Sequence, residues 1–221
     1  SLYWSAELIC AGHFLDLWET IFIIVSKHIY TNNLKLPIYI DNKVTIFRDI
    51  ITSHLNNELI LRNKKEIRKL FAEIITILVY SRKKQSYNYI KIDKNDFILT
   101  EMTHKLQADN LSYSSKLFKT NDPKELFIPI NELCYHLYKT KNTLQIFYWI
   151  EWILNYEILC KKKKEKFICN KREDIYSKEP NDIIWLLWNC IIKCSSKMNI
   201  LIHKSILSIL NLFKLHYTSS I

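Results

Sequence analysis

The chain has 221 residues, and 32 Lys and Arg stand against 22 Asp and Glu, so its net charge of +10 favours an anionic partner. A nucleic acid is expected first and a membrane surface second. Gly12 is the only glycine, which excludes P-loop and dinucleotide-binding folds because their phosphate loops need several glycines.

The scarcity of glycine also predicts the fold class. Tight turns between strands need Gly at positive φ, so one Gly indicates helices joined by polar loops. We expect an all-α fold, an irregular bundle of about seven to eight helices, with at most one short β-hairpin near residues 86–100. The pattern predicts a single helical domain over residues 1–221 that is a piece of a longer chain.

The N-terminal half shows three helical patterns. Residues 2–30 predict one long helix or two in a row, with Gly12 serving either close helix packing or a break. A connector is predicted at 31–43, with Pro37 as a breaker, and a second helix at 44–60. Residues 64–82 form the clearest amphipathic helix, with one apolar stripe of Ile67, Leu70, Phe71, Ile74, Ile75 and Leu78.

A polar, irregular stretch is expected at 83–121, and a new helix start follows it. Asp122 suits an N-cap and Pro123 the first helical position, and Pro129 should kink or restart that helix.

The C-terminal part is more apolar. Residues 142–160 and 181–197 are apolar almost all round, which predicts central helices. A last helix is expected at 199–217, with one face of Ile202, Ile206, Ile209, Leu210 and Phe213.

The cysteines and the longest apolar runs bear on the compartment. The six Cys lack the spacing of a disulfide framework, which predicts buried thiols in a reducing, intracellular compartment. No secretory signal pattern is present at the N-terminus, and charged residues interrupt every apolar run, so no membrane span is expected.

The sequence offers candidate metal ligands and candidate catalytic carboxylates, but it predicts neither kind of site. Cys190 and Cys194 share a helix face upstream of His203, but two Cys on a Trp-rich helix are more typical of a core than of a site with four ligands. Glu151 lies among tryptophans, and Glu7 and Asp16 lie near His13, yet such carboxylates more often form ion pairs. We therefore expect no cofactor and no catalytic residue.

Basic residues give the strongest local signal. Three clusters are predicted to contact phosphates without reading sequence, and one of them lies in a solvated loop at 161–180. Tyr87 and Tyr89 follow one cluster and suit base stacking. The candidate residues are Lys161, Lys162, Lys163, Lys164, Lys166, Lys171 and Arg172; Arg62, Lys64, Lys65, Arg68 and Lys69; and Arg82, Lys83 and Lys84.

Five segments carry a resemblance to a known group of proteins. They are YWSAELICAGHFLDLW (Tyr3 to Trp18), LKLPIYI (Leu34 to Ile40), LFAEI (Leu70 to Ile74), DPKELF (Asp122 to Phe127) and WIEWIL (Trp149 to Leu154). Together they resemble an uncharacterised helical protein of the nucleocytoplasmic large DNA viruses of algae and protists. The resemblance implies a viral product acting in the cytoplasm or nucleus of an infected cell or in the virion. It carries no site residue over, because that group has no assigned activity.

These observations lead to one functional expectation and two rivals. We expect a non-enzymatic helical accessory protein that works on or beside viral DNA, in replication, transcription or packaging, together with other viral proteins. The first alternative is a structural or assembly protein of the virion that binds other proteins through apolar helix faces. An enzyme of unfamiliar type is the second.

Overall fold

The chain divides into two compact helical units in a computed structural model that describes residues 1–29, 33–53, 58–84, 89–165, 167–172 and 181–217. The first unit comprises Ser1–Tyr87 and Ile200–Ile221, and the second comprises Asn88–Asn199. The sequence patterns predict a single helical domain over residues 1–221. The all-α class is confirmed, and the described residues contain no strand.

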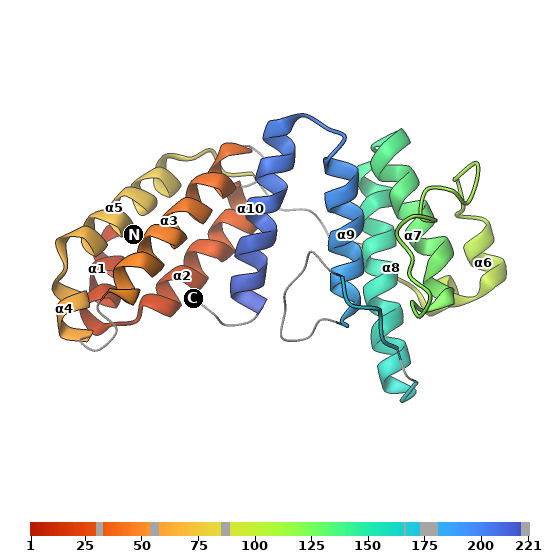
Figure 1. Ribbon diagram of the computed structural model, residues 1–221, viewed down its shortest axis with the longest axis horizontal. Coiled ribbons are helices and arrows are strands. Elements are labelled where there is room, and N and C mark those ends of the chain that lie inside the picture. Colours follow the sequence, from red (N-terminus) through yellow and green to blue (C-terminus); the bar gives the residue numbers. More distant parts are fainter. Residues whose placement is uncertain (30–32, 54–57, 85–88, 166, 173–180, 218–221) are drawn as a thin grey trace. The chain divides into compact units, whose positions relative to one another are not determined.

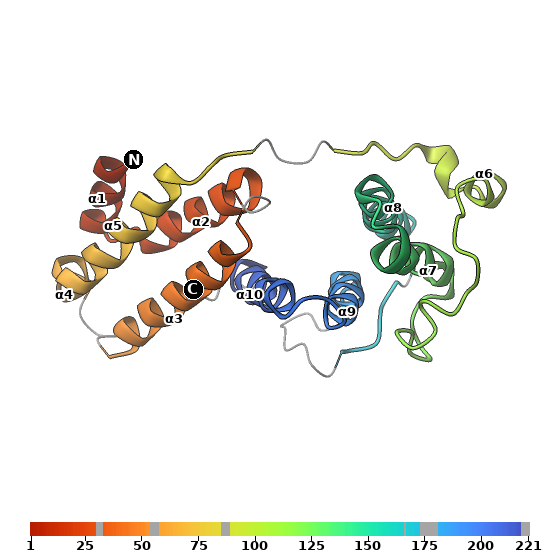
Figure 2. The same cartoon turned by 90° about the horizontal axis from the view of Figure 1, so that it is seen from above.

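The first unit is a layered arrangement of six α-helices (Figures 1 and 2). In chain order they are α1 (Leu2–Ala11), α2 (Phe14–Ile24), α3 (Lys35–Thr52), α4 (Glu58–Asn63), α5 (Lys65–Tyr80) and α10 (Ile200–Tyr217). Helix α1 packs on α2 and α5, and α3 packs on both α5 and α10. The last helix therefore completes a unit whose other helices precede it by more than a hundred residues.

Gly12 separates the first two helices. Its φ of 81° lies in the left-handed region, and its N–H bonds back to the carbonyls of Leu8 and Ile9 at the end of α1. This conformation is a common helix end and favours Gly because it has no Cβ. The prediction of two helices in a row is confirmed, and Gly12 serves as the break. A π-helical turn, Val25–Ile29, extends α2.

The connector predicted at 31–43 is wrong over most of its length. Helix α3 begins at Lys35 and already ends at Thr52, so the helix predicted at 44–60 is also displaced. Pro37 is the third residue of α3, within the first turn, where a backbone N–H has no partner inside the helix. Proline at this position therefore does not break the helix.

Aromatic side chains fill the core of the first unit. Trp18 of α2, Phe47 of α3 and Phe71 of α5 are fully buried, and their ring centroids lie 5.2–5.5 Å apart. The stripe predicted on α5 is buried in full. Helix α10 packs on α3. Of its predicted apolar face only Leu210 is buried, together with Ser205, Ser208 and Leu212. Small side chains let two helices approach closely, which apolar periodicity alone does not reveal.

The second unit is built on three longer helices that lie side by side in Figure 1. They are α7 (Phe127–Tyr135), which continues as a π-helical turn (His136–Thr140), α8 (Thr143–Lys162) and α9 (Ile183–Ser195). Helix α7 packs against both α8 and α9. Trp149, Trp152 and Ile153 form the buried side of α8, whereas Leu144 is 66% exposed, so α8 is less enclosed than its composition predicts.

No β-hairpin forms near 86–100 among the residues described there, which agrees with the expectation of at most one. Lys94–Phe97 form a 3₁₀ turn and α6 (Leu99–Thr103) follows it, while residues 86–88 lie outside the described ranges. Asp93 and Asp96 form a reciprocal capping box around the 3₁₀ turn. The brief polar–apolar alternation therefore belongs to a capped turn.

Buried polar side chains of α7 hold the irregular stretch that precedes it. The Glu132 carboxylate is 2% exposed and accepts hydrogen bonds from the backbone N–H groups of Gln107 and Ala108, at 2.9 and 3.0 Å. The Asn131 side chain donates to the Asn110 carbonyl and accepts from the Ser114 N–H. These bonds satisfy backbone groups that no regular structure pairs.

Candidate nucleic-acid interface

The first basic cluster surrounds the start of α5, and we call Arg62, Lys64, Lys65, Arg68 and Lys69 the α5 cluster. Lys64 is extended, with φ −70° and ψ 121°, and turns the chain from α4 into α5. The Arg68 guanidinium fixes this turn, because its Nε donates to the Arg62 carbonyl at 3.1 Å and its Nη2 donates to Asn63 Oδ1 at 3.0 Å. Lys65, Arg68 and Lys69 are exposed, and Arg62 and Lys64 are half-buried.

The α5 cluster opposes the dipole of its own helix. A helix N-terminus carries a partial positive charge from unpaired backbone N–H groups, so added cations there are unfavourable. No side chain caps the start of α5, and Glu66 is the only acidic residue in its first turn. Cations and free N–H groups at one helix end are the arrangement that binds phosphate.

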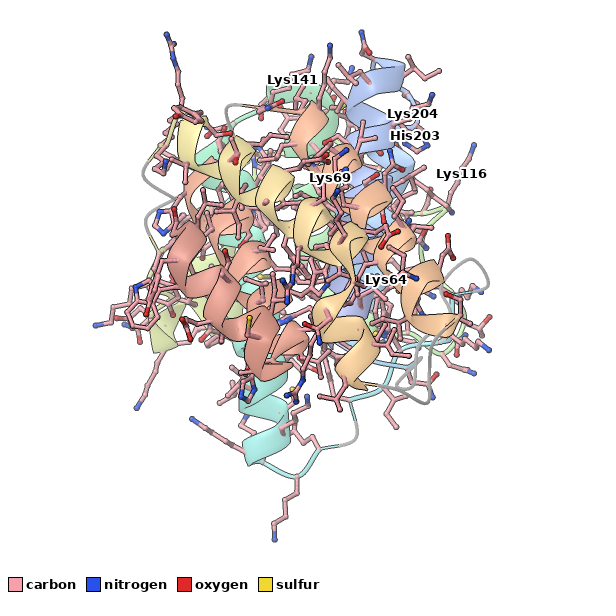
Figure 3. The ribbon with its side chains drawn as sticks, turned by 90° about the vertical axis from the view of Figure 1, so that its left-hand side faces the viewer. Lys64, Lys69, Lys116, Lys141, His203 and Lys204 are labelled. Atoms are coloured by element: carbon pink, nitrogen blue, oxygen red, sulfur yellow. The ribbon has the colours of Figure 1, made fainter. Side chains whose placement is uncertain are left out.

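Besides Glu66, the Glu73 carboxylate of α5 lies near this cluster. Glu73 pairs with Lys43 of α3, with 2.6 Å between Nζ and Oε2. This hydrogen bond, assisted by the charge of Lys69, holds the pKa of the Glu73 carboxyl below its ordinary value. Figure 3 views this unit from its α3 and α5 side and labels Lys64 and Lys69 there. Because Lys43 already neutralises Glu73, the positive charge of Lys69 is available to a ligand.

The second cluster, Arg82, Lys83 and Lys84, follows the other end of α5. A helix of 16 residues spans about 24 Å, so this cluster and the α5 cluster do not form one patch. The Lys83 ammonium donates to the carbonyls of Leu78, Val79 and Ser81, which places it on the negative end of the helix dipole. Arg82 and Lys84 are exposed. Tyr89 is 68% exposed, and Tyr87 lies outside the described residues.

The third cluster lies at the end of α8 in the second unit. Lys161 and Lys162 form the last turn of α8, and Lys164 takes a left-handed conformation with φ 58°. Lys161 pairs with Glu157 at 3.0 Å. Lys162, Lys163 and Lys164 are exposed and form no ion pair with any described residue, and we call these three the α8 lysines. Figure 1 shows the end of α8 extending beyond the neighbouring ends of α7 and α9.

Arg172 is the clear exception among the predicted phosphate contacts. It is 3% exposed, and its Nη2 donates to Asp122 Oδ2 at 2.7 Å. Asp122 in turn accepts hydrogen bonds from the backbone N–H groups of Lys119 and Asn170. The prediction that Arg172 contacts phosphate is therefore corrected, because a buried guanidinium paired with a carboxylate cannot reach a ligand. The prediction that Asp122 caps a helix is also wrong, since its carboxylate accepts hydrogen bonds from Arg172, Lys119 and Asn170 instead.

One further predicted residue, Lys171, lies near this network. Lys171 is exposed, and its backbone carbonyl accepts a hydrogen bond from Lys119 Nζ. Lys166 lies outside the described residues, as do residues 173–180 of the predicted basic loop.

Isolated basic residues add positive charge that no sequence run predicts. Figure 3 labels Lys204 and His203 on α10, in the first unit, and Lys116 and Lys141 in the second. Lys204 is exposed, and its nearest basic residue in the sequence is His203. The first unit holds fourteen Lys and Arg against eight Asp and Glu, a net charge of +6, and the second holds eighteen against fourteen, a net charge of +4. Both units are thus basic.

The cysteines considered above as metal ligands belong to the apolar core of the second unit. Cys134 of α7 joins Cys190 and Cys194 of α9, and all three are buried. The contact with Cys190 raises the pKa of the Cys134 thiol, and the contact with Cys134 raises that of Cys194. His203 belongs to the other unit. Across the described ranges, no group of three or more His, Cys, Asp or Glu is arranged to hold a metal ion.

The carboxylates considered as catalytic groups lie in both units. His13 and Asp16 form an exposed pair with 3.2 Å between Nδ1 and Oδ2. Burial raises the pKa of Glu151, which lies in the second unit.

No helix in the described part of the chain has the length and apolar character needed to cross a membrane. No protein-family model, curated protein or solved structure matches the chain.

Proposed function

We propose that this protein is a non-enzymatic helical accessory protein that binds nucleic acid through its phosphates. Lys65 and Lys69 of the α5 cluster and the three α8 lysines are the contact residues, one set in each unit. The observation that carries the proposal is the accumulation of cations at the positive end of α5, where they oppose helix stability. A phosphate bound there would offset this repulsion and accept bonds from the free N–H groups.

The contact chemistry predicts binding that tolerates any sequence. Lysine ammonium groups contact phosphate as point charges and do not read base edges. The exposed Tyr89 adds one aromatic face on which a base can stack. By the resemblance to proteins of large DNA viruses, viral DNA in replication, transcription or packaging is the ligand we propose first.

Binding of a labelled oligonucleotide, followed by fluorescence anisotropy, tests the proposal. Wild type is compared with K65Q/K69Q, with K162Q/K163Q/K164Q, and with K27Q/K35Q as the matched control. Lys27 and Lys35 are exposed lysines of the first unit, away from the start of α5. We expect both cluster variants to weaken binding to every sequence by a similar factor and the control to bind as wild type. Absence of binding by wild type at low salt would overturn the proposal.

A protein-binding role is the second candidate, and a groove in the first unit favours it. Phe22 and Val25 from the α2 region, Pro37 of α3 and Phe213 of α10 line an apolar groove of about 230 Å³. An apolar groove of this kind suits a hydrophobic side chain of a partner protein, such as a component of a virion. In that case association with the partner would survive high salt, because apolar burial does not depend on charge.

A further inference from the structure

The N-terminal helix exposes an unusually apolar surface. Only Ser5 and Ile9 of α1 are buried, whereas Leu2, Tyr3 and Trp4 are 51%, 67% and 70% exposed. Tyr3 and Trp4 are in edge-to-face contact, with ring centroids 5.5 Å apart. Glu7 is the only charged residue of this helix. A contiguous exposed apolar patch of this kind marks an interaction surface.

A groove continues this surface into the unit. Trp4 and Leu8 of α1, Ile24 of α2, and Ile75 and Val79 of α5 line it, and its volume is about 360 Å³. The Lys83 side chain also lines it. The start of α1 therefore lies beside the end of α5, and the aromatic pair is next to the second basic cluster.

Charge and apolar surface thus occur together at this end of the unit. Arg82, Lys83 and Lys84 are exposed, and Tyr80, which precedes them, is 85% exposed. We name Tyr3, Trp4, Val79, Arg82, Lys83 and Lys84 the basic–aromatic patch. In lipid bilayers, Trp and Tyr lie at the level of the headgroups, while Lys and Arg attract anionic lipids.

We propose that the basic–aromatic patch docks onto an anionic membrane surface. Tyr3 and Trp4 lie at the boundary between headgroups and acyl chains, the groove receives part of an acyl chain, and Arg82 and Lys84 contact the headgroups. The protein lies on the membrane and does not span it. An aliphatic groove favours a lipid over a nucleic acid, because a nucleic acid presents phosphates and flat bases and has no aliphatic chain to fill it.

The placement of the tryptophans makes the proposal directly measurable. The chain has six Trp, of which Trp18, Trp149, Trp152 and Trp185 are at most 3% exposed. Trp188 is half-buried, and Trp4 is the most exposed. Quenching of Trp emission by brominated acyl chains therefore reports insertion of Trp4, and the variant W4F should abolish that quenching.

The experiment uses the whole chain with two kinds of vesicle, pure phosphatidylcholine and phosphatidylcholine containing phosphatidylserine. We expect binding and acyl-chain quenching with the anionic vesicles only. R82Q/K84Q should weaken this binding roughly 25-fold, because each basic residue near an anionic surface contributes about a fivefold factor. W4A should weaken it by about tenfold or more. R48Q/K204Q, which removes two exposed cations from α3 and α10 of the same unit, should bind within about twofold of wild type.

Circular dichroism and thermal melting of each variant show that it is folded, since every substituted side chain is exposed. Absence of binding to anionic vesicles by wild type would overturn the proposal. Binding that W4A and R82Q/K84Q leave unchanged would overturn it equally. Quenching of Trp4 by a single-stranded oligonucleotide, without any vesicle effect, would assign the patch to nucleic acid instead.

Discussion

The buried pair of Asp122 and Arg172 predicts unequal effects for its two partners. Asp122 is 5% exposed and accepts three hydrogen bonds, from Arg172 Nη2 at 2.7 Å and from the backbone N–H groups of Lys119 and Asn170 at 2.7 and 2.9 Å. The Arg172 Nε and Nη1 atoms are buried and have no hydrogen-bond partner among the described residues. Removing Asp122 therefore leaves a buried cation with no compensation, whereas removing Arg172 leaves a carboxylate that still has two donors.

The expected magnitudes follow from this asymmetry. Removing one member of a buried ion pair costs about 3–5 kcal/mol when the other is left uncompensated, so we expect D122A to lose about 4 kcal/mol of unfolding free energy. R172M should lose only about 1–2 kcal/mol, because the carboxylate keeps its charge-assisted bonds to backbone N–H groups. The double variant D122A/R172M should be about 2 kcal/mol more stable than D122A alone, since no unpaired charge remains buried.

Urea unfolding followed by Trp fluorescence measures these values in the relevant unit, because four of the six Trp lie in the second unit. D109A is the matched control. Asp109 is exposed and bonds only to its sequence neighbours Asn110 and Tyr113, so its loss should cost less than about 1 kcal/mol. A loss for D122A below about 1 kcal/mol, or a larger loss for R172M than for D122A, would refute the reasoning.

Three further predictions concern titration, thiol reactivity and backbone geometry. Lys43 lowers the pKa of the Glu73 carboxyl. The ion pair therefore stabilises the fold above the ordinary pKa of Glu, and this stabilisation is lost as the pH falls through the lowered pKa of Glu73. In K43Q, an NMR titration should show the Glu73 pKa rising toward its ordinary value. Of the six thiols, Cys10 alone is exposed, and burial raises the pKa of Cys169 to about 12. A thiol reagent should therefore label one Cys rapidly in the folded protein and all six in urea. Rapid labelling of several Cys in the folded protein would contradict this. Gly12 adopts φ 81°, so G12A should lower the unfolding free energy by about 1 kcal/mol, and a thermal melt at or above that of wild type would be inconsistent with the left-handed turn.

Most of the helices could be predicted from local patterns, because these patterns record which side of a helix is buried. The helix over 64–82 is found as Lys65–Tyr80, and the one over 142–160 as Thr143–Lys162. The start of α3 could not be predicted in the same way. Pro37 suggests a helix break when the start of the helix is unknown. Because α3 begins at Lys35, Pro37 lies in the first turn, where proline is tolerated.

The division into two units depends on contacts that are distant in sequence. Helix α10 packs on α3, and its buried residues include Ser205 and Ser208, which give no apolar stripe. No local pattern indicates that residues 200–217 belong with residues 35–52.

The predicted basic residues differ in the contacts that they form within the protein. A run of lysines shows high local charge, but it does not show which of these side chains form hydrogen bonds or ion pairs within the protein. Lys83 binds helix carbonyls, Lys161 pairs with Glu157, and Arg172 is buried against Asp122. Lys65, Lys69 and the α8 lysines keep exposed ammonium groups. The proposed contact set is therefore smaller than the predicted set, because only a three-dimensional structure identifies these partners.

The salt dependence of nucleic-acid binding tests the central claim most directly. Each phosphate contacted in duplex DNA contributes about 0.9 to the slope of log affinity against log salt concentration. We predict a sequence-independent slope for wild type that falls by about 1.8 in K65Q/K69Q, corresponding to two lost contacts, and is unchanged in K27Q/K35Q. Equal slopes for wild type and K65Q/K69Q would contradict the assignment of the α5 cluster as the phosphate-binding site.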